Sequence, residues 1–153
     1  MPKIYTQLYV QYVFTVKGRK NFIPKSHNDQ LHKYIRGIIK KRKSTLLAIN
    51  NMSDHMHILT SINPNYSFSK FIQEIKAGSS KYINDQKWIA GKFQWQSGYG
   101  AFSYSKSHIE DVVNYIKNQE HHHQKKTFRE EYIDFLEKFS VEYDDKYLFE
   151  FYN

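Results

Sequence analysis

The sequence predicts an α+β protein of the ferredoxin-like (split βαβ) class, with an antiparallel sheet, helices on one face and a C-terminal helical extension. Two observations predict it. Strand-like and helical spacing alternate along the chain in the order β-α-β-β-α-β, and further helices follow. The 153 residues are enough for one hydrophobic core and contain no repeat, linker or low-complexity segment. We therefore expect a single domain over residues 1–153, with the tail 140–153 as its least certain part.

Each element is predicted from its residue spacing and from the residues at its ends. The expected strands are rich in Tyr, Val, Phe and Thr, and Gly, Asn, Ser or Pro stand between them. The expected helices carry apolar residues at helical spacing, and most follow a Ser or Asn that can cap them. The expected strands cover residues 4–16, 44–50 and 55–62, and residues 93–105 form a strand or a hairpin with its bend at Gly98 and Gly100. The expected helices run from Ser26 or Asn28 to about Lys43, from Ser67 to Gly78 or Tyr82, over 108–124 behind Ser107, and over 127–139.

The composition of the chain indicates which classes of partner and of chemistry to expect. Lys and Arg total 23 against 15 Asp and Glu, so the formal charge is +8 and the pI is about 9.4. Such an excess favours a polyanion such as DNA, RNA or an anionic membrane. The absence of Cys excludes disulfides, Cys-ligated zinc and thiol catalysis. No apolar run reaches the ~18 residues of a membrane span, and the first residues lack a signal peptide's apolar block. We expect a cytoplasmic protein without a membrane partner.

A pair of histidines is the first candidate for chemistry. Alternate residues of a strand point to the same face, so His55 and His57 project together while Met56 and Ile58 face the opposite side. Two adjacent imidazoles can supply two nitrogen ligands to one divalent metal. The alternative is a pair of polar residues on a solvated sheet face, and the spacing alone favours that alternative.

A tyrosine and a glutamine on the last long helix form the second candidate. Tyr115 and Gln119 are four residues apart, so they share one helix face on the flank of the apolar stripe. There they can line a groove between helix and sheet, as a nucleophile and an amide ligand of a metal. The alternative is a boundary tyrosine and an exposed glutamine. Of the three consecutive histidines that follow, His122 can face the same groove.

Basic residues gather at the end of the first helix and after the helix 108–124. Such runs are usually solvated, but in a basic chain a phosphate-tracking role is about equally expected. No Walker-type glycine loop, carboxylate cluster for two metals or GxSxG elbow is present. The candidate DNA contacts are Arg36, Lys40, Lys41, Arg42, Lys43, Lys125 and Lys126.

Three motifs in this order and spacing resemble the single-tyrosine HUH transposases of small bacterial and archaeal insertion sequences, a group that includes REP-associated transposases. HUH stands for His, a bulky apolar residue and His. The resemblance extends from the first strand to about residue 149. Its most specific parts are the second and third motifs. The motifs are DHMH over 54–57, FQWQSGYGAF over 93–102, and YIKNQE over 115–120 followed by His122 and His123.

The resemblance implies an activity and a role for four residues. It implies cleavage and rejoining of single-stranded DNA at insertion-sequence ends, through a 5′-phosphotyrosine intermediate and with Mg²⁺ or Mn²⁺. Residue by residue, His55, His57 and Gln119 match the metal ligands, and Tyr115 matches the nucleophile. It also implies a DNA hairpin near the element ends, and a homodimer with composite active sites in which one subunit's tyrosine can act in the other's metal site.

Three other functions remain open from the sequence. A ferredoxin-like sheet with exposed aromatics and basic flanks also describes a non-catalytic single-stranded nucleic-acid-binding module of RNA-recognition type, although no RNP1-like run is present. A domesticated relative that processes genomic hairpins would share the transposase chemistry. A metal-dependent phosphodiesterase with water as nucleophile would leave no protein-linked DNA.

Overall fold

The computed structural model describes residues 2–152 and has a four-stranded antiparallel sheet at its centre, in the order β2-β3-β1-β4. The two central strands pair along their whole length, with Val13 opposite His57. This is the predicted ferredoxin-like arrangement, so the α+β fold class is confirmed. The strands are β1 (Tyr9–Thr15), β2 (Thr45–Asn51), β3 (His55–Ser61) and β4 (Gly100–Tyr104).

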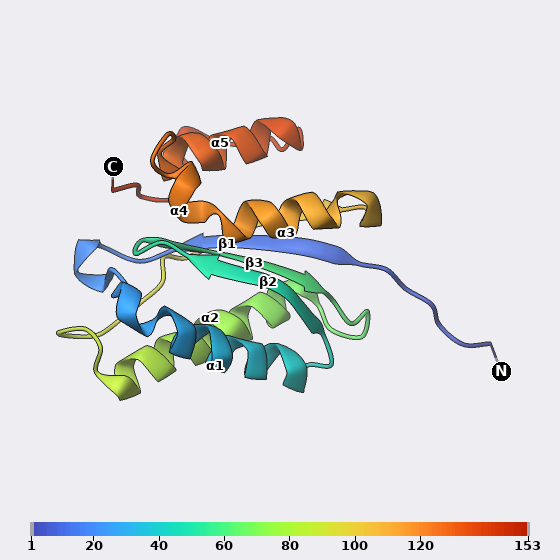
Figure 1. The fold of residues 1–153 in the computed structure, drawn as a ribbon, viewed down its shortest axis with the longest axis horizontal. Helices are drawn as coiled ribbons and strands as arrows, with labels where there is room; N and C mark the ends of the chain where they lie inside the picture. Colours follow the sequence, from blue (N-terminus) through green and yellow to red (C-terminus); the bar gives the residue numbers. More distant parts are fainter. Residues whose placement is uncertain (1, 153) are drawn as a thin grey trace.

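One face of the sheet carries α1 (Asn28–Lys41) and α2 (Phe68–Gln86), which lie side by side in Figure 1. The larger hydrophobic core fills the space between them and the sheet. Tyr12 of β1 and Met56 of β3 point into this core and are completely buried. These two helices belong to the ferredoxin-like unit and cover one face, as predicted.

The other face carries the C-terminal extension (Figure 1), which comprises α3 (Ile109–Lys117), α4 (Gln119–His122) and α5 (Phe128–Lys138). Because the sheet is covered on both sides, its central strands have no solvated face. His55 and His57 alternate with Met56, as predicted, and point into this second layer with 1% and 0% of their surface exposed. The alternative of two histidines on a solvated sheet face is therefore wrong.

Several boundaries differ from the sequence prediction. The helix expected over 108–124 is interrupted at Asn118, whose backbone (φ −98°, ψ 24°) leaves the helical range and redirects the chain into α4. Ser107 does not cap α3, because His108 holds the cap position without a side-chain hydrogen bond. Ser67 does cap α2, accepting a hydrogen bond from Lys70 N at 3.2 Å.

The strands are shorter than the sequence suggests. β1 begins at Tyr9 rather than Ile4, and β4 begins only at Gly100. Before Gly100, Trp95 makes one isolated bridge to Val16, and the chain then bends at Gly98, whose φ of 87° suits glycine. Aromatic and β-branched composition marks these segments correctly as extended, but it does not show where a partner strand ends.

The tail packs back onto the body of the protein. Tyr152 Oη accepts a hydrogen bond from Gly18 N at 2.6 Å and donates one to Val16 O at 3.1 Å. Phe149 packs against Tyr132 with ring centroids 5.0 Å apart. These contacts agree with the prediction of a single domain, which stays a prediction. No helix within residues 2–152 is both long and apolar enough to cross a membrane.

A glycine under α5 fixes how closely that helix approaches the sheet. A Cβ at Gly100 would lie 2.7 Å from Tyr132 Oη and 2.8 Å from its Cε1. We expect Gly100→Ala to lower the free energy of unfolding by roughly 1–3 kcal/mol, the usual cost of overpacking. Urea denaturation measures it. The control is Gly37→Ala on α1, where nothing lies within 4 Å of the added methyl and no loss is expected. Equal stability of the two variants would contradict this account of the α5 contact.

Candidate active site

The second layer brings three potential metal ligands together. One ring nitrogen of His55, one of His57 and a carboxylate oxygen of Glu131 all lie within 4.8 Å of one another, and all three residues are buried. Glu131 Oε1 is 3.1 Å from His57 Nε2 and 3.6 Å from His55 Nε2. The histidine pair was predicted from its spacing, whereas Glu131 was not, because α5 follows β3 by more than sixty residues.

A sequence signal for Glu131 does exist. The buried face of α5 carries Phe128, Tyr132 and Leu136, and Glu131 belongs to that same face. A carboxylate within an apolar helical stripe is rarely buried without a partner. The capping box at Thr127 assigns a role to the neighbouring exposed acid, Glu130, and not to Glu131.

Each imidazole is oriented by a hydrogen bond on its far nitrogen. Asp54 Oδ1 accepts from His55 Nδ1 at 2.7 Å, and Gln11 Oε1 accepts from His57 Nδ1 at 2.8 Å. Gln11 Nε2 in turn donates to Tyr104 Oη at 2.8 Å. This hydrogen bond keeps the amide oxygen of Gln11 pointing toward His57. Partners of this kind fix the tautomer and ring orientation of metal-ligating histidines.

The orientation of the two imidazoles indicates whether His55, His57 and Glu131 could bind a metal. With Nδ1 as the donor in both rings, each Nε2 presents a lone pair, and the Glu131 carboxylate presents another. Glu131 Oε1 then lies 3.1 Å and 3.6 Å from two nitrogen lone pairs, which repel its own unless a cation lies among them. Burial lowers the pKa of His55, which favours the neutral imidazole that a metal needs. Two nitrogens and one oxygen suit a divalent ion such as Mn²⁺.

Tyr115 lies at the edge of this cluster. Its hydroxyl donates to Glu131 Oε2, while Oε1 faces the histidines. Burial, and then the negative charge of Glu131, raise the pKa of Tyr115 above its ordinary value, so the hydroxyl keeps its proton at neutral pH. Burial opposes ionisation of Glu131, but when no metal is bound the attraction of proton-bearing imidazoles, above all His57 and His123, outweighs burial and lowers the carboxyl pKa. Glu131 is therefore an ionised acceptor for the tyrosine proton.

Gln119 lies between His55 and Glu131. Its Oε1 is 3.3 Å from His55 Nε2 and its Nε2 donates to Glu131 Oε2 at 3.2 Å. The side chain is completely buried, so the alternative of an exposed glutamine is wrong. Tyr115 and Gln119 share one side of the α3–α4 segment, as predicted, although the helix breaks between them.

Two of the three consecutive histidines also reach the site. His122 stacks on the Tyr115 ring with centroids 4.3 Å apart, so it faces the predicted groove. His123 Nε2 is 3.1 Å from Gln119 Oε1 and 3.2 Å from Glu131 Oε1, a contact that the sequence did not suggest. His121 is exposed.

The tyrosine helix packs on the sheet of its own chain. Asn50 Nδ2 on β2 donates to Ile116 O at 3.0 Å and to Lys117 O at 3.3 Å, which holds the end of α3. Val112 and Ile116 pack with Leu59 of β3. Tyr115 therefore lies beside the histidine pair of the same chain.

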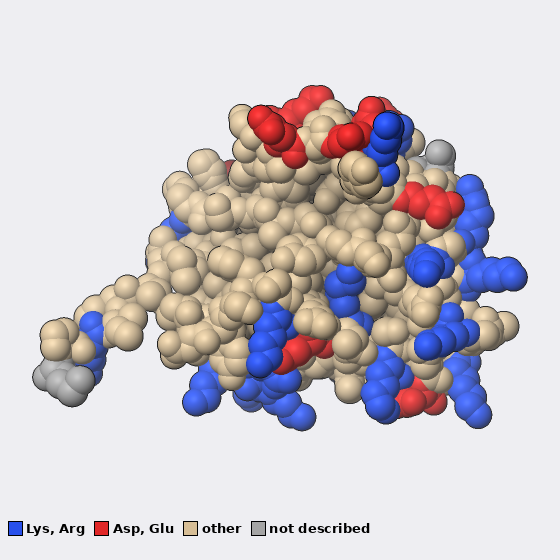
Figure 2. Space-filling view, turned by 180° about the vertical axis from the view of Figure 1, so that it is seen from behind, with Lys and Arg blue, Asp and Glu red and all other residues tan. Residues whose placement is uncertain are grey.

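The predicted DNA contacts lie on opposite sides of the sheet. The cluster of α1 is on the far side from the site, and in it Arg42 pairs with Glu74. Lys125 and Lys126 follow α4 near the site, where Lys126 pairs with Asp134. Figure 2 shows acidic side chains over the C-terminal helices and mostly basic ones below. Residues 109–153 carry 11 of the 15 acidic residues, so the excess of positive charge belongs to the rest of the chain.

Comparison with known proteins gives one family match and two similar folds. The family model described as "Transposase IS200 like" matches residues 4–119. The fold is similar to a candidate transposase from Deinococcus radiodurans R1, with a TM-score of 0.59, 22% identity, and coverage of 78% of this chain and 98% of the other. It is also similar to a REP-associated tyrosine transposase bound to a REP hairpin, with a TM-score of 0.60, 16% identity, and coverage of 80% and 73%. No curated protein matches the sequence.

Proposed function

The chain belongs to the IS200-like transposase family, and from that premise we propose that it cleaves and rejoins single-stranded DNA at insertion-sequence ends through Tyr115. The observation that carries the proposal is the position of the Tyr115 hydroxyl, which donates to Glu131 beside the paired Nε2 atoms of His55 and His57. A structural tyrosine needs a hydrogen-bond partner, but not two converging imidazoles next to it.

In the cleavage step, Tyr115 Oη attacks the scissile phosphorus and the bond from phosphorus to the 3′ oxygen breaks. The product is a 5′-phosphotyrosine and a free 3′ hydroxyl. Glu131, which accepts the hydrogen bond from the tyrosine, takes its proton. Glu131 then gives this proton up, so that the 3′ oxygen leaves as a hydroxyl and Glu131 returns to its carboxylate form. The covalent bond preserves the energy of the phosphodiester, so the reverse reaction with another 3′ hydroxyl rejoins the strand without ATP.

His55, His57 and Glu131 would hold a divalent metal, with Gln119 as the further ligand that the resemblance assigns. Bound there, Mg²⁺ or Mn²⁺ would polarise the scissile phosphate and neutralise the charge that develops on it. The protein contributes the orientation of the imidazoles through Asp54 and Gln11.

The ligand set is testable by substitution. We expect Gln119→Ala and Glu131→Gln each to weaken Mn²⁺ binding at least roughly tenfold, the minimum usual for lost metal-site partners. Isothermal titration calorimetry measures the affinity. Glu137→Gln, an exposed acid of the same helix, is the matched control and should bind as the parent does. A variant with unchanged affinity would remove its residue from the ligand set.

Two statements about partners remain proposals. The neighbour bound to a REP hairpin supports recognition of a DNA hairpin near the cleaved end. A homodimer remains a prediction, which a single chain does not test; within it Tyr115 could act beside its own His57 or, in a composite site, beside the partner's.

Mixing two inactive variants tests the composite sites. Because Tyr115 lies beside its own His57, we expect a mixture of Tyr115→Phe and His57→Ala proteins to form no covalent DNA complex. A denaturing gel measures this. Product at a quarter or more of the parent level would show instead that α3 exchanges between subunits.

The proposal as a whole is tested by covalent trapping. The protein is mixed with labelled single-stranded DNA from the flanks of its own gene, with Mn²⁺ or with EDTA, and separated on a denaturing gel. A metal-dependent band of protein-linked DNA supports the transposase chemistry. Cleaved DNA without a protein-linked band would indicate a phosphodiesterase, and bound but intact DNA with every strand tested would indicate a binding module.

A further inference from the structure

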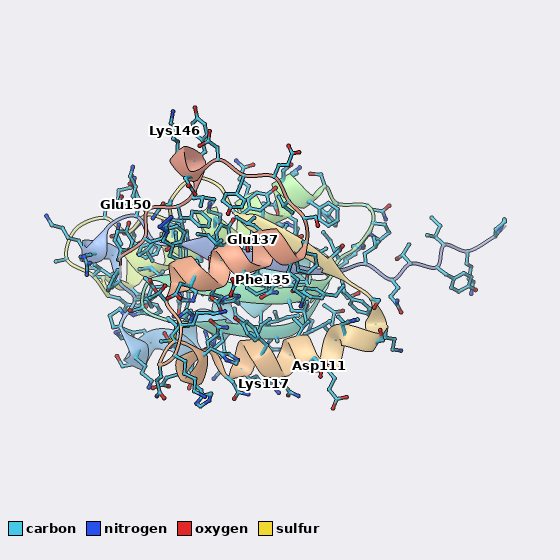
Figure 3. The ribbon with its side chains drawn as sticks, turned by 90° about the horizontal axis from the view of Figure 1, so that it is seen from above. Asp111, Lys117, Phe135, Glu137, Lys146 and Glu150 are labelled. Carbon is cyan, nitrogen blue, oxygen red and sulfur yellow. The ribbon has the colours of Figure 1, made fainter. Side chains whose placement is uncertain are left out.

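A groove runs from the candidate active site between α3 and α5. It has a volume of about 690 Å³, and its floor is formed by β4 and by Gln11 of β1. α3 lines it with Asp111, Val112 and Tyr115, and α5 lines it with residues at the same helical spacing. Figure 3 shows the two helices side by side, with Phe135 on the side of α5 that faces α3. On α5 and at its C-terminal cap the lining residues are Glu131, Asp134, Phe135, Lys138 and Phe139.

The groove and the active site are continuous. Tyr115 and Glu131, which carry the proposed chemistry, line one end of the groove. From Glu131 to Lys138, α5 rises by about 10 Å at 1.5 Å per residue. A group that extends from the scissile phosphate along this length would reach the far end of the groove, at Phe139 and Lys138.

The walls suit a planar heterocycle better than a phosphate backbone. Four aromatic rings line the groove, and two of them, Tyr104 and Phe139, meet edge to face at 5.3 Å. Phe135 is backed by Phe102 in a stack at 5.3 Å, which holds its ring in place. Charges of both signs line the groove, and Lys126 is already paired with Asp134. A row of phosphates would require an excess of cations.

One polar group of the groove indicates which bases fit. Asp111 is exposed, and no cation within residues 2–152 forms an ion pair with it. A carboxylate only accepts hydrogen bonds, so it favours a base with an exocyclic amino group. Cytosine, adenine and guanine have such a group, whereas thymine does not.

We propose that this groove binds the nucleobase that flanks the scissile phosphate, stacked against Phe135 and Phe139, with its amino group on Asp111. The proposal rests on the proposed function, because the strand enters the groove from the site of cleavage. It adds a base-selecting subsite in which Asp111 comes from α3, while the stacking rings of Phe135 and Phe139 lie outside the residues 4–119 matched by the family.

Binding without cleavage tests the subsite. Fluorescence anisotropy is measured in EDTA with labelled homopolymers of deoxycytidine, deoxyadenosine and thymidine, on the Tyr115→Phe background. We expect the first two to bind more tightly than thymidine. Phe139→Ala should lower affinity for them roughly tenfold, as loss of one stacking contact does. Asp111→Asn should reduce the preference over thymidine. Phe68→Ala, an exposed aromatic on α2 on the opposite face, is the control and should change nothing.

A second variant covers the case in which Phe139→Ala disturbs folding. Phe139→Leu keeps an apolar side chain against Phe102 and Tyr104 and removes only the aromatic ring. It should reduce homopolymer binding to nearly the same extent. Unchanged affinity in folded Phe139→Ala and Phe139→Leu proteins would overturn the subsite. Covalent trapping is done with the same two variants in the protein that keeps Tyr115. If the variants lose binding while no strand gives a covalent complex even with the parent protein, the subsite stands and the cleavage chemistry fails. If binding is unchanged and covalent complexes form as in the parent, the subsite fails and the chemistry stands.

Discussion

Replacing Tyr115 with Phe is expected to abolish the covalent DNA–protein complex. The ring remains, and with it the stacking on His122, so the substitution removes only the nucleophilic oxygen. Loss of a nucleophile in other enzymes costs orders of magnitude in rate, so product should fall by at least roughly 10³-fold. Stability should change by only about 1 kcal/mol, the usual value of one hydrogen bond. Metal-dependent trapping on a denaturing gel, with thermal unfolding of the same samples, measures both effects.

The matched control is Tyr34→Phe, on the α1 side of the sheet. Tyr34 stacks on Tyr82 at 4.0 Å, and its substitution removes a tyrosine hydroxyl far from the site. It should form the covalent complex at the parent level. A Tyr115→Phe protein that still forms the complex would remove this residue as the nucleophile and direct attention to the other hydroxyl of the groove, Tyr104.

The sequence predicts the histidine pair and the tyrosine–glutamine pair of the site, but not Glu131, which lies between them. His55 and His57 follow from strand alternation, and Tyr115 with Gln119 from helical spacing, since local geometry alone places each pair on one face. The role of each pair came from the resemblance to HUH transposases. Glu131 joins them only through the packing of α5 on the sheet, which no local pattern describes. It is nevertheless the residue that contacts all the others.

In the fold, too, the elements that depend on local sequence patterns were predicted, whereas the packing between distant elements was not. The order of elements and most helices were predicted, including α5 at almost its full length. The sequence did not show that the C-terminal extension covers the second face of the sheet. This depends on pairs of surfaces, such as Val112 and Ile116 of α3 against Leu59 of β3. Burial of the histidine pair follows from that covering, so the solvated alternative failed for a tertiary reason rather than a local one.

Replacing His57 with Ala is expected to remove both the response to metal and the covalent product. The variant loses one of two nitrogen ligands and leaves Gln11 Oε1 without its imidazole donor in a buried site. In the parent, Mn²⁺ at a hundredfold excess over its dissociation constant should stabilise the fold by about 2.7 kcal/mol. The variant should show almost none of this stabilisation, and should unfold roughly 1–3 kcal/mol more easily in EDTA because of the unsatisfied buried group.

The decisive comparison is the shift in melting temperature between EDTA and Mn²⁺, because it separates metal binding from catalysis. His121→Ala on α4 is the control, since this exposed imidazole lies close to the site in sequence yet forms no hydrogen bond to it within residues 2–152. It should keep the full shift and the full yield of covalent complex. If His57→Ala keeps the shift but loses the product, the metal binds elsewhere and the histidine acts on the substrate directly. If His57→Ala loses the shift in melting temperature but keeps the covalent product, Tyr115 attacks without the metal. The nitrogen and oxygen atoms of the site would then bind protons rather than a metal.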